Sequence, residues 1–234
     1  MSKKPITPLR RRLDGRGKLI INRLSLHEQV VNRLRQMIVS GMLAAGEKIR
    51  VTELSEELDV SLTPLREALK VLAGEQLVEL MPNRGARVAP LTVEGTRLLF
   101  EVIAGIESNA AELAADRITV EELAEIEDRH ARMKRHHENG EKDAYFELNR
   151  EIHDMIVDFA DNPILTQVRS QLAVQAERAR FLSVASGAHR LEAMQEHEDV
   201  MAALRAHDTD AAREIWKRHL IRSGEEICRV LTLW

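Results

Sequence analysis

Three histidines in the second half of the chain are candidate metal ligands. They are His153 in "LNREIHDMI", His197 in "MQEHEDVMAALRAHD" and His219 in "EIWKRHLIRS". Asn149 precedes His153 by four residues, so a helix would place both on one face. Neutral imidazole nitrogens bind divalent transition metals, and an amide can add its carbonyl oxygen. Each histidine alone is more typical of a hydrogen-bonded polar residue than of a ligand, so both interpretations stay open.

A second candidate site lies in "DVSLTPLREALKVL", residues 59–72, where a polar turn leads into a helical pattern. Ser61 or Thr63 can cap this helix, and Pro64 fits its first turn, where a missing N–H costs nothing. The helix is expected to bury a leucine stripe made of Leu65, Leu69 and Leu72. Arg66 and Lys70 then point outward, toward whatever the helix contacts.

The elements that hold this second site are short helices and one hairpin within residues 25–90. Helical patterns begin at Ser25 and Thr52, each of which can cap its helix, and at the turn just described. In "LVELMPNRGARVAPL", residues 77–81 and 86–89 can pair around a turn that contains Arg84 and Gly85, and Gly85 allows a positive φ. Three helices and a basic-tipped hairpin make a winged helix-turn-helix, which predicts duplex DNA as the partner.

Charge divides the chain into two unlike parts. The net charge is −4, but residues 1–90 carry 16 Lys and Arg against 10 Asp and Glu (+6), and residues 91–234 carry 18 against 28 (−10). Residues 1–24 form a basic arm that would attract phosphates and make binding salt-sensitive. A disordered tail that aids solubility explains the arm equally well.

Composition excludes several classes of protein. No apolar run is long enough for a membrane span, and the basic start lacks a signal-peptide core, so we expect a cytoplasmic protein with no membrane partner. The single Cys228 excludes an internal disulfide framework and a cysteine metal cluster. Aromatic residues are only 3%, which leaves little for stacking on single-stranded nucleic acid.

The segment "VTELSEELDVSLTPLREALKVLAGEQLVELMPNRGARV", residues 51–88, closely resembles the DNA-binding domain of the GntR family of bacterial transcription regulators. The resemblance implies a homodimer that binds an inverted-repeat operator in double-stranded DNA. By position it implies DNA contacts from the recognition helix and the wing, at Ser61, Thr63, Arg66, Lys70, Arg84 and Gly85. Leu62 stands where the family usually has an arginine, so the operator is expected to differ from the usual one.

Beyond Pro90 the pattern is helical throughout. Six helices are predicted, at about 92–116, 119–138, 142–160, 163–184, 189–207 and 209–231. Their boundaries come from caps and breakers, among them Thr92, the Thr119 and Glu122 capping box, and Gly140. Residues 91–234 are therefore predicted to form an all-α bundle, and the chain as a whole is mainly α.

The bundle resembles the FCD effector-binding and dimerisation domain of the FadR subfamily, and six helices favour its VanR-like branch. In that domain one Asp and three His from separate helices meet inside the bundle. The resemblance implies metal ligands at Asn149, His153, His197 and His219, although Asn149 replaces the usual Asp. A histidine-rich set favours zinc or nickel over manganese.

The same resemblance bears on the effector. Three imidazoles and an amide leave a dication uncompensated, which favours a small carboxylate as the effector. Ile103 stands where many relatives have an effector-binding arginine, four residues before Glu107. Arg178 and Arg180 could bind the effector instead, although surface salt bridges are the more ordinary role for them.

The remaining histidines and methionines are given structural roles. His130, His136 and His137 lie on a charged helix and are predicted at the surface. Four methionines with helical spacing are predicted to be core residues; they are Met133, Met155, Met194 and Met201.

Together these features predict a ligand-responsive transcriptional repressor rather than an enzyme. One alternative is a metal-dependent hydrolase, but no HExxH motif is present, and Glu196 and Glu198 lack a spacing that marks a general base. Another alternative keeps the DNA-binding domain and makes the bundle a dimerisation domain without a ligand.

Overall fold

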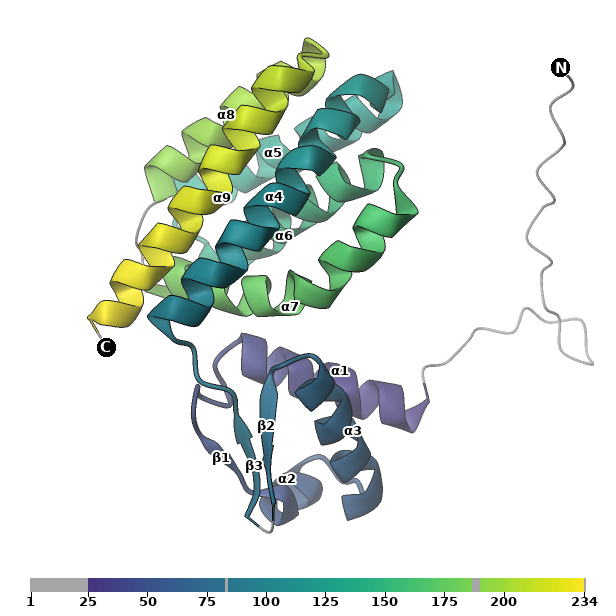
Figure 1. Cartoon of the computed structure of the whole chain (residues 1–234), viewed down its shortest axis with the longest axis vertical. Helices are drawn as coiled ribbons and strands as arrows, with labels where there is room; N and C mark the ends of the chain where they lie inside the picture. The colour runs from purple at the N-terminus through teal and green to yellow at the C-terminus, as the bar shows by residue number, and fades with distance from the viewer. Residues whose placement is uncertain (1–24, 83, 187–189, 234) are drawn as a thin grey trace, which may run out of the picture.

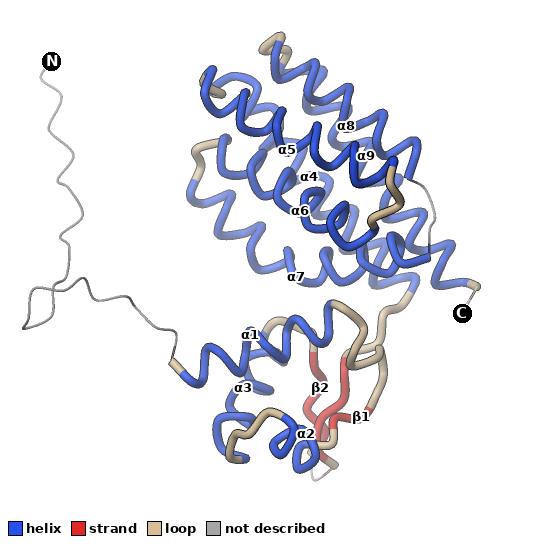
Figure 2. The backbone as a smooth tube through the Cα atoms, turned by 180° about the vertical axis from the view of Figure 1, so that it is seen from behind, coloured by secondary structure: helices blue, strands red, loops and turns tan. Residues whose placement is uncertain are grey.

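The computed structural model describes residues 25–82, 84–186 and 190–233. The predicted basic arm of residues 1–24 lies outside these ranges. Within them the chain forms a small winged domain below a helical bundle (Figure 1), which confirms the predicted fold class. Figure 2 shows that all the strands of the described chain lie in the winged domain.

The winged domain begins with α1 (Leu26–Val39), β1 (Lys48–Ile49), α2 (Val51–Glu57) and α3 (Leu62–Gly74), followed by β2 (Val78–Met81) and β3 (Gly85–Val88). Ser25 caps α1 as predicted, in a capping box with Glu28. The strands form an antiparallel sheet in the order β1-β3-β2, with Leu80 opposite Ala86. One core cluster unites the helices and the sheet and includes Leu34, Leu65, Leu72 and Val88.

Two local expectations in this domain were wrong. The strand β1 was not predicted, because two residues are too short to show an alternating pattern. Thr52 does not cap α2: this helix already begins at Val51, directly after the residues that pair with β3, and its N-cap position is Arg50. Ser61, rather than Thr63, occupies the N-cap position of α3, although its side chain makes no capping hydrogen bond.

The bundle consists of α4 (Val93–Arg117), α5 (Val120–Glu138), α6 (Lys142–Phe159), α7 (Pro163–Ser186), α8 (Arg190–Arg205) and α9 (Thr209–Thr232). All six agree with the predicted helices to within two residues at each end. The predicted caps are present: Thr92 accepts a hydrogen bond from the backbone of Gly95, and Thr119 and Glu122 form a capping box.

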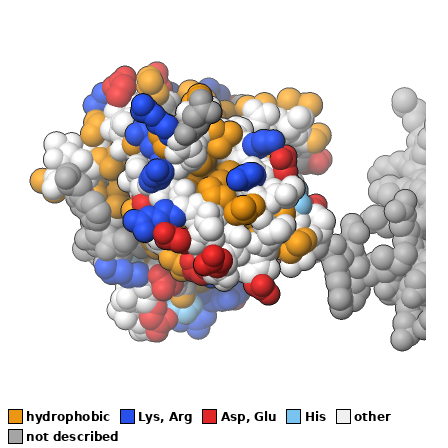
Figure 3. All heavy atoms as spheres, turned by 90° about the horizontal axis from the view of Figure 1, so that it is seen from below, with side chains coloured by type: hydrophobic (Ala, Val, Ile, Leu, Met, Phe, Trp, Pro, Cys, Tyr) orange, Lys and Arg blue, Asp and Glu red, His pale blue; other side chains and the backbone are white. Residues whose placement is uncertain are grey.

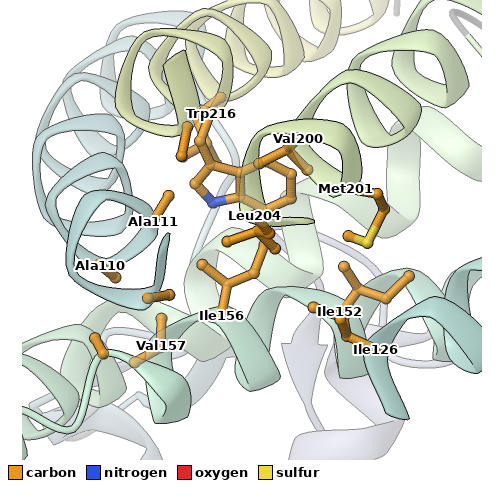
Figure 4. Close-up of a cluster of buried hydrophobic side chains, with 14 of the residues drawn as sticks. Ala110, Ala111, Ile126, Ile152, Ile156, Val157, Val200, Met201, Leu204 and Trp216 are labelled. Atoms are coloured by element: carbon orange, nitrogen blue, oxygen red, sulfur yellow. The ribbon is translucent and has the colours of Figure 1, made fainter. Parts of the chain in front are cut away.

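The long helices α4 and α9 pack along each other, and the other four surround them (Figure 1). Gly224 allows this close approach, because a Cβ there would lie 2.5 Å from the Cβ of Phe100. Figure 4 shows the bundle core, in which Trp216 projects from α9 toward side chains of α4, α6 and α8. The four methionines pack as predicted, with Met133, Met194 and Met201 buried and Met155 packed against the core.

Helix α7 lies at the junction of the two domains. It passes beside α1 in both ribbon views (Figures 1 and 2), and Val174 of α7 packs against the core of the winged domain. Arg178 of α7 donates a hydrogen bond from Nη2 to the carbonyl oxygen of Ala89, at 2.7 Å, in the segment that joins the domains. This helix therefore contacts the bundle core and the winged domain at once.

Candidate metal centre

Three of the four predicted metal ligands meet inside the bundle. His153 of α6, His197 of α8 and His219 of α9 each offer a nitrogen, and these atoms all lie within 4.8 Å of one another. The three side chains are buried, with exposed fractions of 3% or less. Residues from three helices far apart in the sequence thus form one compact set of donors, which the tight helix packing positions.

Two buried carboxylates orient two of these rings. Nδ1 of His153 lies 2.7 Å from Oε2 of Glu107, and Nδ1 of His219 lies 3.1 Å from Oε2 of Glu196. A carboxylate can only accept, so each Nδ1 carries the proton and each Nε2 keeps a free lone pair. Nε2 of His153 and both ring nitrogens of His197 are buried without a hydrogen-bond partner among the described residues. The donor set therefore fits a divalent metal ion.

The protonation states also suit a metal. Burial, reinforced by Arg180, lowers the pKa of His153 to about 3, against the opposing effect of Glu107. Burial likewise lowers the pKa of His219 and places the pKa of His197 well below its ordinary value. All three rings are thus neutral near pH 7, which is the form that binds metals.

Arginines already neutralise the carboxylates around the site. Glu107 lies 3.1 Å from Nε of Arg169 and 3.6 Å from Nη2 of Arg180. Burial alone would raise the pKa of Glu107, but Arg180, His153 and Arg169 outweigh burial and hold it well below its usual range. Glu196 similarly accepts from Nη1 of Arg222 at 3.0 Å. Because both carboxylates are already paired with arginines, little negative charge remains to balance that of a bound dication.

Trp216 forms one wall of the site. Its ring centroid lies 4.5 Å from that of His153, 4.8 Å from that of His219 and 5.2 Å from that of His197. The indole packs against all three imidazoles and limits their rotation. Its fluorescence should therefore respond to a change at these rings.

Asn149, the fourth residue implied by the resemblance, is also buried and lies one turn before His153 on α6. Ile103 is fully buried in the core of the bundle. Neither position supplies a charge to the interior, so the cations at the metal centre come from other residues.

The two candidate effector residues are buried, and the expected surface role for them was wrong. Arg180 is 8% exposed and Arg178 is 5% exposed. Arg180 lies beside Glu107 and over the ring of Phe100, and its Nε and Nη2 lack a hydrogen-bond partner within the described chain. Arg178 instead reaches the linker at Ala89, so the structure does not bring the two arginines together. Residues two apart on a helix point to nearly opposite sides.

The surface prediction for His130 was also wrong. His130 is 7% exposed, and its ring stacks on that of His197 with centroids 6.3 Å apart. His130 faces inward because the side of α5 that carries it packs against α8. His136 and His137 are half-buried rather than fully exposed, and His136 pairs with Glu141.

Sequence reasoning missed three contributors to the site: Glu107, Glu196 and Trp216. A signal existed for Glu107, an acid on the apolar face of α4 between Ala104 and Ala111. Trp216 lies three residues before His219 and therefore on the same helical face. Glu196 gave no such signal, because many exposed acids surround it in the sequence.

The candidate DNA-binding residues are separate from this site. Ser61, Thr63, Arg66 and Lys70 are exposed on α3, and Lys70 pairs with Glu67 at 2.8 Å. Arg84 and Gly85 are exposed at the turn of the wing, where Gly85 has the expected positive φ of 89°. Figure 3, which views the molecule from the winged-domain end, shows Lys and Arg side chains spread over this face.

A winged helix-turn-helix joined to a six-helix bundle with a buried histidine site defines a DNA-binding protein with a separate helical domain. Comparison with protein families gives the particular group. Residues 26–88 match the model "Bacterial regulatory proteins, gntR family", and residues 98–222 match the model "FCD domain". The chain belongs to the GntR family of transcriptional regulators, in the group with an FCD domain, and it is a regulator rather than an enzyme.

Relatives agree with this assignment. The HTH-type transcriptional repressor RspR of Escherichia coli is 26% identical over 205 residues, which cover 88% of this chain and 90% of RspR. The HTH-type transcriptional regulator McbR of the same organism is 28% identical over 206 residues, covering 86% and 91%.

Solved structures show the same fold. The E. coli McbR/YncC structure superposes with a TM-score of 0.77 at 23% identity, covering 88% of this chain and 99% of that one. A GntR regulator from Rhodococcus gives a TM-score of 0.74 at 18% identity, covering 90% and 100%. No described helix is both long and apolar enough to cross a membrane.

Proposed function

We propose that this regulator is a dimeric repressor that releases its operator when a small carboxylate binds at a metal ion in the bundle. The observation that carries the proposal is the buried histidine triad. Its donor atoms lie within 4.8 Å of one another, and several have no hydrogen-bond partner in the described structure. Unpaired buried nitrogens are costly unless a ligand binds them.

His153, His197 and His219 would hold the metal, with Asn149 as a neutral fourth ligand. Three imidazoles favour zinc or nickel over manganese. When bound, the metal supplies a positive centre that polarises and binds an oxygen ligand. Because arginines already neutralise Glu107 and Glu196, the dication would attract an anion.

Arg180 is the residue that would receive the other end of such an effector. It is buried, and two of its nitrogens have no hydrogen-bond partner in the described chain, although Nη2 lies 3.6 Å from Glu107. Ile103 supplies no cation from its position on α4. The guanidinium of Arg180 would supply that cation from α7 instead. A guanidinium can bind a carboxylate through two parallel hydrogen bonds.

DNA binding would use α3 and the wing, with Arg66, Lys70 and Arg84 toward the duplex. The pairing of two chains would use exposed apolar residues of α4 and α7. They are Leu98 and Val102 on α4 and Ile164 and Val168 on α7; each pair is four residues apart, and all are more than 40% exposed. Exposed apolar residues at helical spacing suit a homodimer contact. The RspR relative, named a repressor, supports repression.

A first experiment tests the metal. Protein stripped with a chelator is titrated with Zn²⁺, Ni²⁺ and Mn²⁺ while Trp fluorescence and bound metal are measured. We expect one tight zinc or nickel ion per chain in the wild type, and about a hundredfold weaker binding in His197→Ala, because a ligand is removed. His136→Ala, which removes a histidine at the end of α5, is the matched control. Equal binding by the two variants would overturn the metal centre.

A second experiment tests the switch. Duplexes selected from a random pool by full-length protein serve as the operator, and acetate, lactate, succinate, malate and citrate are the effector probes. An effector that favours the released form should weaken operator binding roughly 5- to 150-fold, and operator should weaken effector binding by the same factor. Arg180→Gln and His197→Ala should abolish this response. Unchanged operator affinity throughout a probe's binding range excludes that probe as the effector, and a response that survives in both variants overturns the proposed site.

A further inference from the structure

A second cavity lies between the two domains, away from the histidine triad. It has a volume of about 460 Å³ and is lined mostly by apolar side chains. Ile38 and Ala45 contribute from α1 and the turn after it, Leu91 from the linker, and Leu231 from α9. This volume falls within the range of roughly 300–1,000 Å³ that is usual for small-molecule sites.

One buried cation faces this cavity. Arg178 is 5% exposed and lines the cavity, and its one hydrogen bond in the described chain is from Nη2 to the Ala89 carbonyl. No carboxylate among the described residues forms an ion pair with it, in contrast to Arg169 and Arg180, which share Glu107. Burial lowers the pKa of Arg178 to about 10, which still leaves it charged at neutral pH.

Among the described residues the guanidinium of Arg178 has one neutral partner and no anionic one, so its charge is only partly compensated. A ligand carboxylate would supply the missing negative charge and accept hydrogen bonds from the guanidinium. The apolar walls would suit an alkyl chain rather than a second charged group, because a second charge would be buried there without a partner. Charge and shape together therefore specify the class of ligand.

We propose that the cavity between the domains is a binding site for a small amphipathic monocarboxylate, with its carboxylate on Arg178 and its alkyl chain along Ile38, Leu91 and Leu231. Since α1 and α7 both line the cavity, an occupant contacts the DNA-binding domain and the bundle at once. It would therefore influence their relative position. This site is independent of the metal centre and of the effector proposed there.

The test uses octanoate as the probe and metal-free full-length protein, by isothermal titration calorimetry. We expect one saturable site with a dissociation constant of about 1 mM or tighter. Arg178→Gln should weaken binding at least about tenfold, because it removes the charge, while Arg213→Gln, at an exposed arginine of α9 that pairs with Glu112, serves as the matched control and should leave it unchanged. Octanol, which has the chain without the charge, should also bind at least about tenfold more weakly.

Ala45→Phe provides a second test that does not disturb the buried arginine. It adds a large side chain at the cavity wall and should block octanoate binding while the circular dichroism spectrum stays that of the wild type. Octanoate binding that is absent in the wild type, matched by octanol, or as strong in Arg178→Gln as in Arg213→Gln would overturn the proposal.

Discussion

At the scale of single residues, the candidate metal centre consists of neutral imidazoles, two of them oriented by buried carboxylates. The sequence alone identified the three histidines as candidate ligands, from their residue type and their order along the helices. Glu107 and Glu196 could not be assigned in the same way, since the partner of each ring is fixed by how α4, α6, α8 and α9 pack. His130 illustrates the same limit: a charged neighbourhood in the sequence predicted exposure, whereas packing against His197 buries it.

Asn149 gives a prediction about charge. Asn149→Asp adds a carboxylate on the helical face of His153, so it should bind zinc more tightly by roughly tenfold, or about 1.4 kcal/mol. The same change should weaken the preference of the metal-loaded protein for anionic probes. Asn109→Asp, on an exposed part of α4, is the control. Metal titration followed by Trp fluorescence measures both variants, and equal affinities would remove Asn149 from the ligand set.

The buried histidines also predict how stability depends on pH. In metal-free protein their pKa values are lowered on folding, whereas an unfolded histidine titrates near its ordinary value of about 6.5. Below that value the unfolded chain takes up protons that the folded chain does not, so the folded state loses stability as the pH falls. Each histidine should cost about 1.4 kcal/mol per pH unit between its unfolded and folded pKa values.

Urea unfolding of chelator-treated protein between about pH 7.5 and 5.5 measures this effect. The free energy of unfolding should stay nearly level down to about pH 6.5 and fall below it. Bound zinc should delay the fall, because the metal competes with protons for the rings. A free energy that does not change below about pH 6.5 would contradict the neutral buried state of the triad.

At the scale of helices and strands, the sequence predicted most boundaries because capping residues act locally. Thr92, Thr119 and Ser25 each form the hydrogen bond that their position implied. The strand β1 and the start of α2 escaped prediction, since pairing with β3 determines both and lies far along the chain. A helix or strand boundary that is set by a nearby side chain can be predicted from the local sequence. A boundary that is set by a tertiary contact cannot.

Gly224 yields a prediction about the contact between α4 and α9. Gly224→Ala gains up to about 1 kcal/mol of helix propensity, but its Cβ would overlap the Cβ of Phe100. Overpacking of this kind costs about 1–3 kcal/mol, so the variant should be less stable than the wild type. Gly105→Ala in α4 is the control, because a Cβ at that position would have no neighbouring atom within 4 Å, and it should be slightly stabilising. Urea unfolding compares the two variants; a stabilising Gly224→Ala would show that the helices can separate at little cost.

At the scale of the whole molecule, the opposite charges of the two parts predicted different partners for them, but no pattern predicted the contact between the parts. That contact depends on α7, whose residues reach Glu107 beside the histidine triad, the linker and the winged domain. No local pattern indicates such contacts. The prediction that Arg178 and Arg180 form surface salt bridges was wrong for this reason.

The exposed face of α4 predicts how the oligomer should respond to mutation. Leu98→Glu combined with Val102→Glu places two charges on an apolar face and should shift the protein from dimer to monomer in analytical ultracentrifugation. Operator binding should weaken with it, because a monomer contacts only one half-site. Val120→Glu, at an exposed hydrophobic residue that begins α5, is the control. A double variant that stays dimeric would place the dimer contact elsewhere.

The placement of Arg178 and Arg180 on α7 has a consequence for how such regulators diversify. One arginine serves the boundary with the DNA-binding domain, and the other, on the opposite side of the same helix, faces the triad. Under the proposed function, substitutions on the triad side would change which compound binds there, while the side that docks on the winged domain is inherited intact. A descendant could acquire a new inducer by altering one half of a single helix, without having to re-evolve its connection to DNA.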